Sequence, residues 1–271
     1  MDNDRFLEMT DARLRYRDEG TGPAILLIHG WSLDLDMWEP QVGDLSRSFR
    51  LIRFDRRGYG LSSGKPSLAH DAADVQALCR HLGVQRAAFV GMSQGARVLH
   101  RLAGAIPGSI CCLVFDGSPD MRPGGDLTAN DVPLSQFAEV LRNEGIEALR
   151  RNWAAHPLTR LRTEDQTAHA LLSRMLGRYA ATDLIVPAAE LTETIVLPRL
   201  EDIHVPALVL NGEFDLESRR LAGEALSKLL PRAERKVICG AGHLANLDNP
   251  QSYNEILRRF LERYALADGV A

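Results

Sequence analysis

Short, almost uninterrupted apolar runs recur along the chain and alternate with segments of helical apolar spacing. The runs are AILLIHG (24–30), RLIRFD (50–55), AAFVG (87–91), CCLVFDG (111–117), ALVLNG (207–212) and RKVICGAG (235–242). Continuous runs of this kind are typical of parallel strands that are covered on both faces. Helical patterns occupy about 70–82, 94–105, 218–229 and 250–264. Together they predict a mostly parallel, doubly wound α/β sheet.

Two segments depart from this alternation. Residues 5–22, RFLEMTDARLRYRDEGTG, predict an antiparallel hairpin at the edge of the sheet. Between 119 and 194 helical patterns follow one another without a strand signal, which predicts a helical cap inserted into a core domain of 1–118 and 195–271. Open α/β sheets bind their ligands at the carboxyl ends of the strands, so the cap is expected to shape a pocket there.

Composition narrows the class of protein. The 271 residues are 45% apolar, which is enough for a sizeable core, and the net charge of −4 comes from mixed acidic and basic residues. This charge pattern argues against a nucleic-acid partner, and no apolar run is long enough for a membrane partner. The start, MDNDRFLEMT, has no secretory pattern. The four cysteines lack metal-site spacing and are expected to be reduced core thiols of a cytoplasmic protein. A homo-oligomer is compatible with the sequence.

A serine stands between two glycines at the point where a predicted strand gives way to a predicted helix, in GMSQG (91–95). Such an abrupt reversal crowds the backbone, and Gly91 and Gly95 relieve the crowding. The strained turn presents the Ser93 hydroxyl beside the positively polarised start of the following helix. The sequence therefore predicts that Ser93 is a nucleophile.

A nucleophilic serine requires a base and an acid that orients the base. His243 follows the run 235–242, and Asp215 follows the preceding run, so both are expected at the edge of the sheet that carries Ser93. The chain order Ser, Asp, His is the one that this architecture uses. Asp116, at the end of another predicted strand, is the alternative acid.

A tetrahedral oxyanion requires donors that are already in place. The backbone N–H of Gln94 is one candidate, and the N–H of Trp31, after the first predicted parallel strand, is the other. His29 is expected to hold that loop by hydrogen bonds. The candidates for the wall of the substrate pocket are Trp38, Trp153 and His156.

Five motifs resemble those of the α/β-hydrolase fold, in the same order and over essentially the whole chain. They are HGW (29–31), DRRGYGLSS (55–63), GMSQG (91–95), the Asp of NGEFD (211–215) and the His of GAGHLANLDNP (240–250). The resemblance implies a Ser93–Asp215–His243 triad with Trp31 and Gln94 as oxyanion donors. Arg56 and Arg57 in the second motif are expected to form structural ion pairs, with binding of a substrate carboxylate as the alternative.

Within this fold the chain is similar to cofactor-free haloperoxidases and aryl esterases (perhydrolases), and to 3-oxoadipate enol-lactonase-like hydrolases. Two segments depart from the haloperoxidase pattern: Ser32 stands where that group usually has proline, and MSQGA (92–96) stands where its elbow usually has F-S-M-G-G. The resemblance implies hydrolysis of a small ester or lactone through an acyl-enzyme, with no metal or organic cofactor.

Three alternatives remain open at this stage. The same triad serves carbon–carbon bond hydrolases and acyltransferases of this fold, which need pocket groups that the sequence does not identify. A hydrolase-like sensor of small molecules is the third. Dehalogenases and epoxide hydrolases are disfavoured, since their elbow carries Asp where this chain has Ser93.

Overall fold

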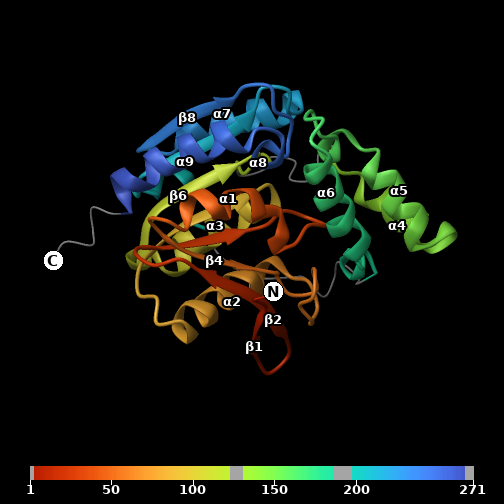
Figure 1. The fold of residues 1–271 in the computed structure, drawn as a ribbon, viewed down its shortest axis with the longest axis horizontal. Helices are drawn as coiled ribbons and strands as arrows, with labels where there is room; N and C mark the ends of the chain where they lie inside the picture. The colour runs from red at the N-terminus through yellow and green to blue at the C-terminus, as the bar shows by residue number, and fades with distance from the viewer. Residues whose placement is uncertain (1–2, 123–130, 186–196, 266–271) are drawn as a thin grey trace.

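The computed structural model describes residues 3–122, 131–185 and 197–265. Within them, eight strands form one sheet in the order β1-β2-β4-β3-β5-β6-β7-β8 (Figure 1). The strands are β1 Arg5–Glu8, β2 Arg13–Glu19, β3 Ala24–Ile28, β4 Arg50–Phe54, β5 Ala87–Met92, β6 Ile110–Asp116, β7 Ala207–Gly212 and β8 Ala233–Ile238. The pairs from β4 to β8 are parallel, whereas β1–β2 and β2–β4 are antiparallel. The predicted parallel sheet and edge hairpin are confirmed.

The central strands are buried along almost their whole length. Every residue of β5 and β7 is buried, as the continuous apolar runs predict for strands covered on both faces. The last apolar run of the sequence, RKVICGAG, is less buried than the others. Strand β8 lies at the edge, its middle residues are partly or fully exposed, and it ends at Ile238. An edge strand has a neighbour on one side only, so apolar sequence there does not guarantee burial.

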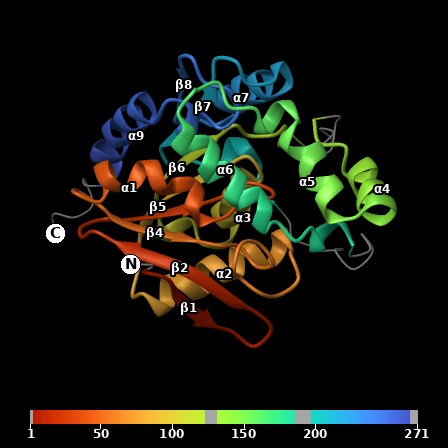
Figure 2. The ribbon, with the colours of Figure 1, turned by 45° about the vertical axis from the view of Figure 1, so that its right-hand side comes forward.

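Helices cover both faces of the sheet (Figures 1 and 2). One face packs on residues of α2, α3 and α7, and the other packs on residues of α1, α9 and the cap helices. The helices are α1 Glu39–Leu45, α2 Leu68–His81, α3 Gln94–Ala105, α4 Leu134–Glu144, α5 Ile146–Ala154, α6 Gln166–Arg178, α7 Glu217–Leu229, α8 Ala245–Asp248 and α9 Pro250–Tyr264. None of the helices in the described residues is long and apolar enough to cross a membrane.

Helices α4, α5 and α6 lie between β6 and β7 in the chain, where the sequence predicts a helical cap, and they stand to one side of the sheet in Figure 1. No strand occurs in the described part of this insertion. Its predicted first residue, 119, follows closely on β6, whereas the predicted end at 194 lies outside the described residues. A cluster of aromatic rings joins the cap to the core, namely Trp31, Phe137, Trp153 and Tyr179.

The cysteine prediction is only partly correct. Cys79 and Cys112 are buried, but Cys239 is exposed, because it lies in the turn that follows the edge strand β8. The sequence around Cys239 is apolar, which is why burial was expected there.

Candidate active site

Ser93 occupies the turn between β5 and α3, with φ = 52° and ψ = −110°. Positive φ is strained for a residue with a side chain, and such strain persists where the surrounding structure enforces it. The two flanking glycines show what enforces it. A Cβ on Gly91 would lie 2.5 Å from the Gly95 carbonyl oxygen, and a Cβ on Gly95 would lie 2.4 Å from the Ile28 carbonyl oxygen. Only glycine fits at these two positions, as the motif predicts.

His243 and Asp215 form a buried pair at the carboxyl ends of the strands. The imidazole Nδ1 lies 3.0 Å from Asp215 Oδ1 and 3.1 Å from Oδ2, and both side chains are almost fully buried. The backbone N–H of Leu216 donates a second hydrogen bond to Asp215 Oδ1. An ionised carboxylate only accepts hydrogen bonds, so Nδ1 carries the proton and Nε2 is the basic nitrogen.

Asp116, the alternative acid, does not contact His243. Its Oδ2 accepts a 3.1 Å hydrogen bond from the Tyr253 hydroxyl, which comes from α9. Complete burial, aided by the nearby Asp215 charge, raises the pKa of Asp116 to about 8, against the hydrogen bond from Tyr253 that lowers it. Asp116 is therefore protonated at neutral pH, and Asp215 is the carboxylate that orients the imidazole.

The loop after β3 lies directly against the elbow. A Cβ on Gly30 would be 2.8 Å from Met92 Sδ and 3.4 Å from Ser93 Cβ, so the HGW backbone passes very close to the serine. Gln94 begins α3, and the first N–H groups of a helix have no partner within it. The Gln94 side chain is held by Arg56, whose Nη1 donates to Oε1 at 2.7 Å. The HGW loop and the start of α3, which carry the predicted oxyanion donors Trp31 and Gln94, thus both lie next to Ser93.

His29 has the structural role that the sequence predicts. Its Nδ1 donates to the Gly30 carbonyl at 2.8 Å, and its Nε2 accepts from the Arg56 N–H at 2.9 Å. Burial, with a smaller effect of the Arg56 charge, lowers the pKa of His29 to about 3, so the ring is neutral. The two arginines of the DRRGYGLSS motif form structural ion pairs, Arg56 with Asp71 and Arg57 with Asp74.

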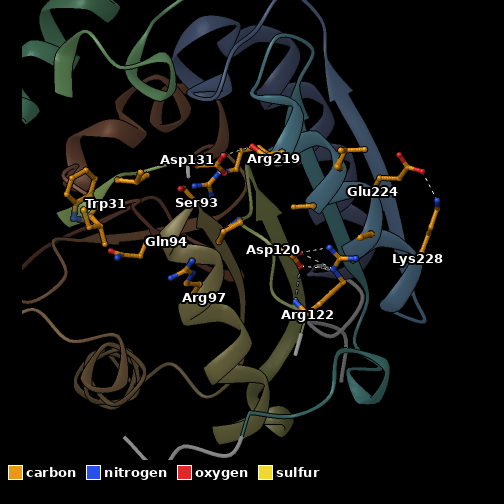
Figure 3. Close-up of a pocket in the computed structure, with 17 residues that line it drawn as sticks. Trp31, Ser93, Gln94, Arg97, Asp120, Arg122, Asp131, Arg219, Glu224 and Lys228 are labelled. Carbon is orange, nitrogen blue, oxygen red and sulfur yellow. Dashed lines mark hydrogen bonds and ion pairs between the residues drawn. The ribbon is translucent and has the colours of Figure 1, made fainter. Parts of the chain in front are cut away.

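Two cavities meet at the serine. The larger has a volume of about 650 Å³, and its wall includes Ser93, Gln94 and Trp31 (Figure 3). The smaller, of about 30 Å³, is lined by Ser93 and His243 together with Trp153 and other apolar cap and core residues. The predicted nucleophile and base therefore face one shared space, which opens beside a cavity large enough for a small organic substrate.

The three residues predicted to line the pocket differ in where their side chains lie. Trp153 lines the smaller cavity, as predicted. The prediction for Trp38 is wrong. Its side chain has no exposed surface and packs in the core at the start of α1, so it cannot line an accessible pocket. His156 stacks on Trp153 with ring centroids 4.8 Å apart, and it belongs to the wall of neither cavity. It supports a pocket residue and does not itself line the space.

Sequence reasoning missed two residues that lie close to the histidine or its loop. Gly117, with φ = +54°, passes so close that a Cβ would lie 2.8 Å from His243 Cε1. Asp248 lies directly before Asn249, which caps α9. Asp248 accepts from the N–H groups of Gly242 and Arg162, and so it ties the histidine loop to the cap. The glycine directly after Asp116 was a visible signal, whereas nothing local to Asp248 revealed its partner 86 residues away.

A family model described as the alpha/beta hydrolase fold matches residues 23–250 of the chain. The chain belongs to the alpha/beta hydrolase family. It is 30% identical to a non-heme chloroperoxidase of Streptomyces lividans, over 91% of this chain and 95% of that protein. It is also 25% identical to 3-oxoadipate enol-lactonase 2 of Acinetobacter baylyi, over 95% of this chain and 96% of that protein.

A solved alpha/beta hydrolase structure agrees with the architecture described above. The thermophilic esterase of Thermogutta terrifontis, determined with malate bound, superposes with a TM-score of 0.79 at 25% identity and covers 96% of this chain and 99% of its own. The resemblance to haloperoxidases, esterases and enol-lactonases inferred from the motifs is confirmed by these relatives.

This alpha/beta hydrolase differs from the haloperoxidase pattern at Ser32, directly after the HGW motif. Ser32 has φ = 61°, a conformation closed to proline, whose ring fixes φ near −65°. The Ser32 hydroxyl accepts a 2.6 Å hydrogen bond from Trp153 Nε1 on α5. Ser32 therefore has a backbone conformation that proline cannot adopt, and its hydroxyl forms a contact between the core and the cap beside the cavity of Ser93.

Proposed function

We propose that this enzyme hydrolyses a carboxylic ester or lactone of a small organic acid through an acyl-Ser93 intermediate. The observation that carries the proposal is the buried His243–Asp215 pair, which shares a cavity with a serine held at positive φ on a strand-to-helix turn. A serine at such a turn, a histidine and a carboxylate that sets the tautomer of the histidine are the parts that acyl transfer requires.

In the proposed reaction Ser93 Oγ attacks the acyl carbon while His243 Nε2 takes the hydroxyl proton. The N–H groups of Trp31 and Gln94 stabilise the oxyanion, and the positive end of the α3 dipole adds to their effect. Asp215 keeps the proton on Nδ1 and stabilises the imidazolium. The proton then passes to the leaving alkoxide, and water cleaves the acyl-enzyme by the reverse sequence, which releases the acid and restores Ser93.

The relatives support this reaction class more than oxidation. An enol-lactonase and an esterase align over almost the whole chain. The alignment with the chloroperoxidase is equally long, but Ser32 gives the segment after HGW a backbone conformation that proline cannot adopt. We therefore do not extend the proposal to perhydrolysis.

Labelling and turnover together test the proposal. A fluorophosphonate should modify Ser93 stoichiometrically, and the wild-type enzyme should turn over short-chain aryl esters many times. Ser93→Ala should lose the label and lower kcat by about 10⁶-fold, the scale of loss in other serine triads. Labelling without turnover of any ester, lactone or diketo acid would indicate a sensor. Activity retained by Ser93→Ala would refute the nucleophile.

A further inference from the structure

Trp31, which lies in the core loop beside Ser93, is held by a carboxyl group of the cap. Its indole Nε1 donates a 2.5 Å hydrogen bond to Asp183 Oδ2. Asp183 belongs to a short 3-10 helix, η4 Thr182–Leu184, that follows α6, and its Oδ1 accepts a 2.7 Å hydrogen bond from the Tyr179 hydroxyl. Trp31 is buried, and an indole N–H can only donate, so it requires an acceptor of this kind.

Backbone strain occurs on both sides of this hydrogen bond. Among the described residues, those other than glycine that have positive φ are Ser32, Ser93 and Ala181. Ser32 directly follows Trp31, and Ala181 lies at the start of η4, two residues before Asp183. Such strain persists only where the surrounding structure enforces it, and it is common at functional sites. The strained residues are thus the predicted nucleophile and one residue in each segment that the hydrogen bond joins.

The side chains of the two predicted oxyanion residues are held by different parts of the molecule. The core holds Gln94, because Arg56 Nη1 donates to its Oε1 at 2.7 Å and the Tyr59 hydroxyl donates to the same oxygen at 3.4 Å. The cap holds Trp31 through Asp183. A backbone N–H stabilises an oxyanion only if it is in place before the reaction, and locked side chains keep such donors in place.

Ring packing holds the indole less narrowly than this hydrogen bond. In the described residues, the rings packed against Trp31 belong to Phe137, Trp153 and Tyr179, with centroids 6.1, 4.6 and 5.3 Å from the indole. Ring contacts tolerate a range of separations, whereas a hydrogen bond weakens steeply when it is misaligned. The contact with Asp183 therefore restricts the position of Trp31 most.

We propose that Asp183 is a positioning residue of the oxyanion site, which holds Trp31 from the cap so that the Trp31 backbone N–H is in place when the oxyanion forms. This inference rests on the proposed function and adds a cap residue to it. Asp183 is not among the described residues that line the two cavities at Ser93. Its effect therefore passes through Trp31, and its loss should weaken stabilisation of the transition state more than binding of the substrate.

Three variants of cap aspartates test the role with phenyl acetate as the substrate. Asp183→Leu has a side chain of similar size that accepts no hydrogen bond, so kcat should fall by about 10- to 100-fold while KM changes less than about threefold. Asp183→Asn keeps an oxygen for the indole, and the Tyr179 hydroxyl can turn to accept from its amide, so kcat should recover to within about threefold of the wild type. Asp165→Ala removes the carboxylate that caps α6 elsewhere on the cap and should change kcat less than about twofold.

A pair of ketones gives a readout that a loss of stability would not produce. With trifluoroacetophenone, Ser93 Oγ adds to the carbonyl carbon, the hydroxyl proton passes to His243 Nε2, and the carbonyl oxygen becomes the oxyanion. Acetophenone has a similar shape, but its carbonyl carbon is a far weaker electrophile, so it reports binding without the oxyanion. Asp183→Leu should bind trifluoroacetophenone at least about tenfold more weakly than the wild type, and acetophenone within about twofold.

Trp31→Phe removes the same hydrogen bond from the donor side. If the two side chains act together, adding Asp183→Leu to Trp31→Phe should lower kcat by less than about twofold further. If Asp183→Leu does not fold in urea-unfolding measurements, Trp31→Phe carries the test alone. A Trp31→Phe enzyme with unchanged kcat and unchanged affinity for trifluoroacetophenone would then overturn the positioning role.

The positioning role and the proposed function fail in different ways. If the wild type hydrolyses no ester and the fluorophosphonate does not label Ser93, the proposed function is wrong and the positioning role falls with it. If the wild type is active but Asp183→Leu retains its kcat, raises KM alone or weakens both ketones alike, only the positioning role is wrong. An equal loss of kcat in Asp183→Asn and Asp183→Leu would also overturn it, because the amide keeps the acceptor.

Discussion

Two aspartates at the carboxyl ends of the strands have the same functional group in different surroundings. The carboxylate of Asp215 accepts hydrogen bonds from the imidazole of His243 and from the Leu216 N–H. Asp116 is completely buried, and among the described residues its carboxyl group accepts a hydrogen bond only from Tyr253. Desolvation of Asp116 raises the pKa of its carboxyl group, so Asp116 binds a proton at neutral pH and does not take part in orienting the imidazole.

This difference predicts that two isosteric variants lose very different amounts of activity. Asp215→Asn should lower kcat by about 10⁴-fold, because an amide can stabilise the wrong imidazole tautomer. Asp116→Asn replaces a neutral acid with a neutral amide of the same shape and should change kcat less than about threefold. Steady-state kinetics on one aryl ester checks both. A large loss for Asp116→Asn with an unchanged Asp215→Asn would reverse the two assignments.

The raised pKa of Asp116 also makes folding depend on pH. Its folded value of about 8 exceeds its ordinary value of 3.8, so between these limits the native state binds more protons than the unfolded state. The contribution of this group to stability therefore declines as pH rises from about 4 to about 8. Asp116→Asn has no ionisable group at this position, so its stability does not show this decline. Between pH 5 and pH 8 the free energy of unfolding of Asp116→Asn, measured in urea, should therefore rise relative to that of the wild type.

At the scale of elements, the elbow depends on close packing of α3 against the strands. Gly95 lies against the carbonyl oxygens at the end of β3, so α3 begins nearer to the sheet than any side chain would allow. That approach brings the segment His29–Gly30–Trp31, which follows β3, close to the start of α3. The glycine therefore sets a distance between two elements, and its contribution is steric.

Two glycine-to-alanine variants separate this steric role from helix propensity. Gly95→Ala should destabilise the protein by about 1–3 kcal/mol, the usual cost of overpacking, and should lower kcat because α3 must shift. Gly43→Ala is the control, since nothing lies within 4 Å of a Cβ there. On α1 it should add about 0.5–1 kcal/mol of stability. Equal effects of the two variants in urea unfolding would argue against the packing role.

At the scale of the whole molecule, ion pairs dock the cap onto the core. Arg178, at the end of α6, reaches Asp34 at 2.8 Å and Asp36 at 2.6 Å in the core loop after β3. Both carboxylates are buried, and Arg15 lies 3.3 Å from Asp36 on the other side. Because this loop also carries Trp31, the position of the cap and the position of the predicted oxyanion donor are physically linked.

Two arginines one turn apart on α6 provide a matched test of this docking. Arg178→Met leaves buried carboxylates with one cation fewer and should cost about 3 kcal/mol of unfolding free energy. Arg174 reaches the same Asp36 at 3.4 Å but is 57% exposed, so Arg174→Met should cost less than about 1 kcal/mol. Hydrogen exchange of α6 should accelerate only in the first variant. Unchanged protection in Arg178→Met would show that the aromatic cluster alone holds the cap.

The sequence predicted most of the fold because the signals were local. Continuous apolar runs identified the parallel strands, and GMSQG identified the turn that carries Ser93. Predictions failed where burial depended on distant neighbours. Cys239 and β8 are more exposed than their apolar sequence suggests, since no further strand covers that edge, and Trp38 packs into the core although aromatic residues near the HGW loop are plausible pocket residues.

The chain by itself determined the order of strands and helices, the strained serine and the candidates for its partners, because backbone strain, periodicity and spacing are properties of neighbouring residues. Only the tertiary structure decided which aspartate meets the imidazole, that Asp248 ties the histidine loop to the cap, and that Arg97 and Arg219 line one cavity. Those outcomes depend on which segments fold together, and on how far burial removes each charged group from water.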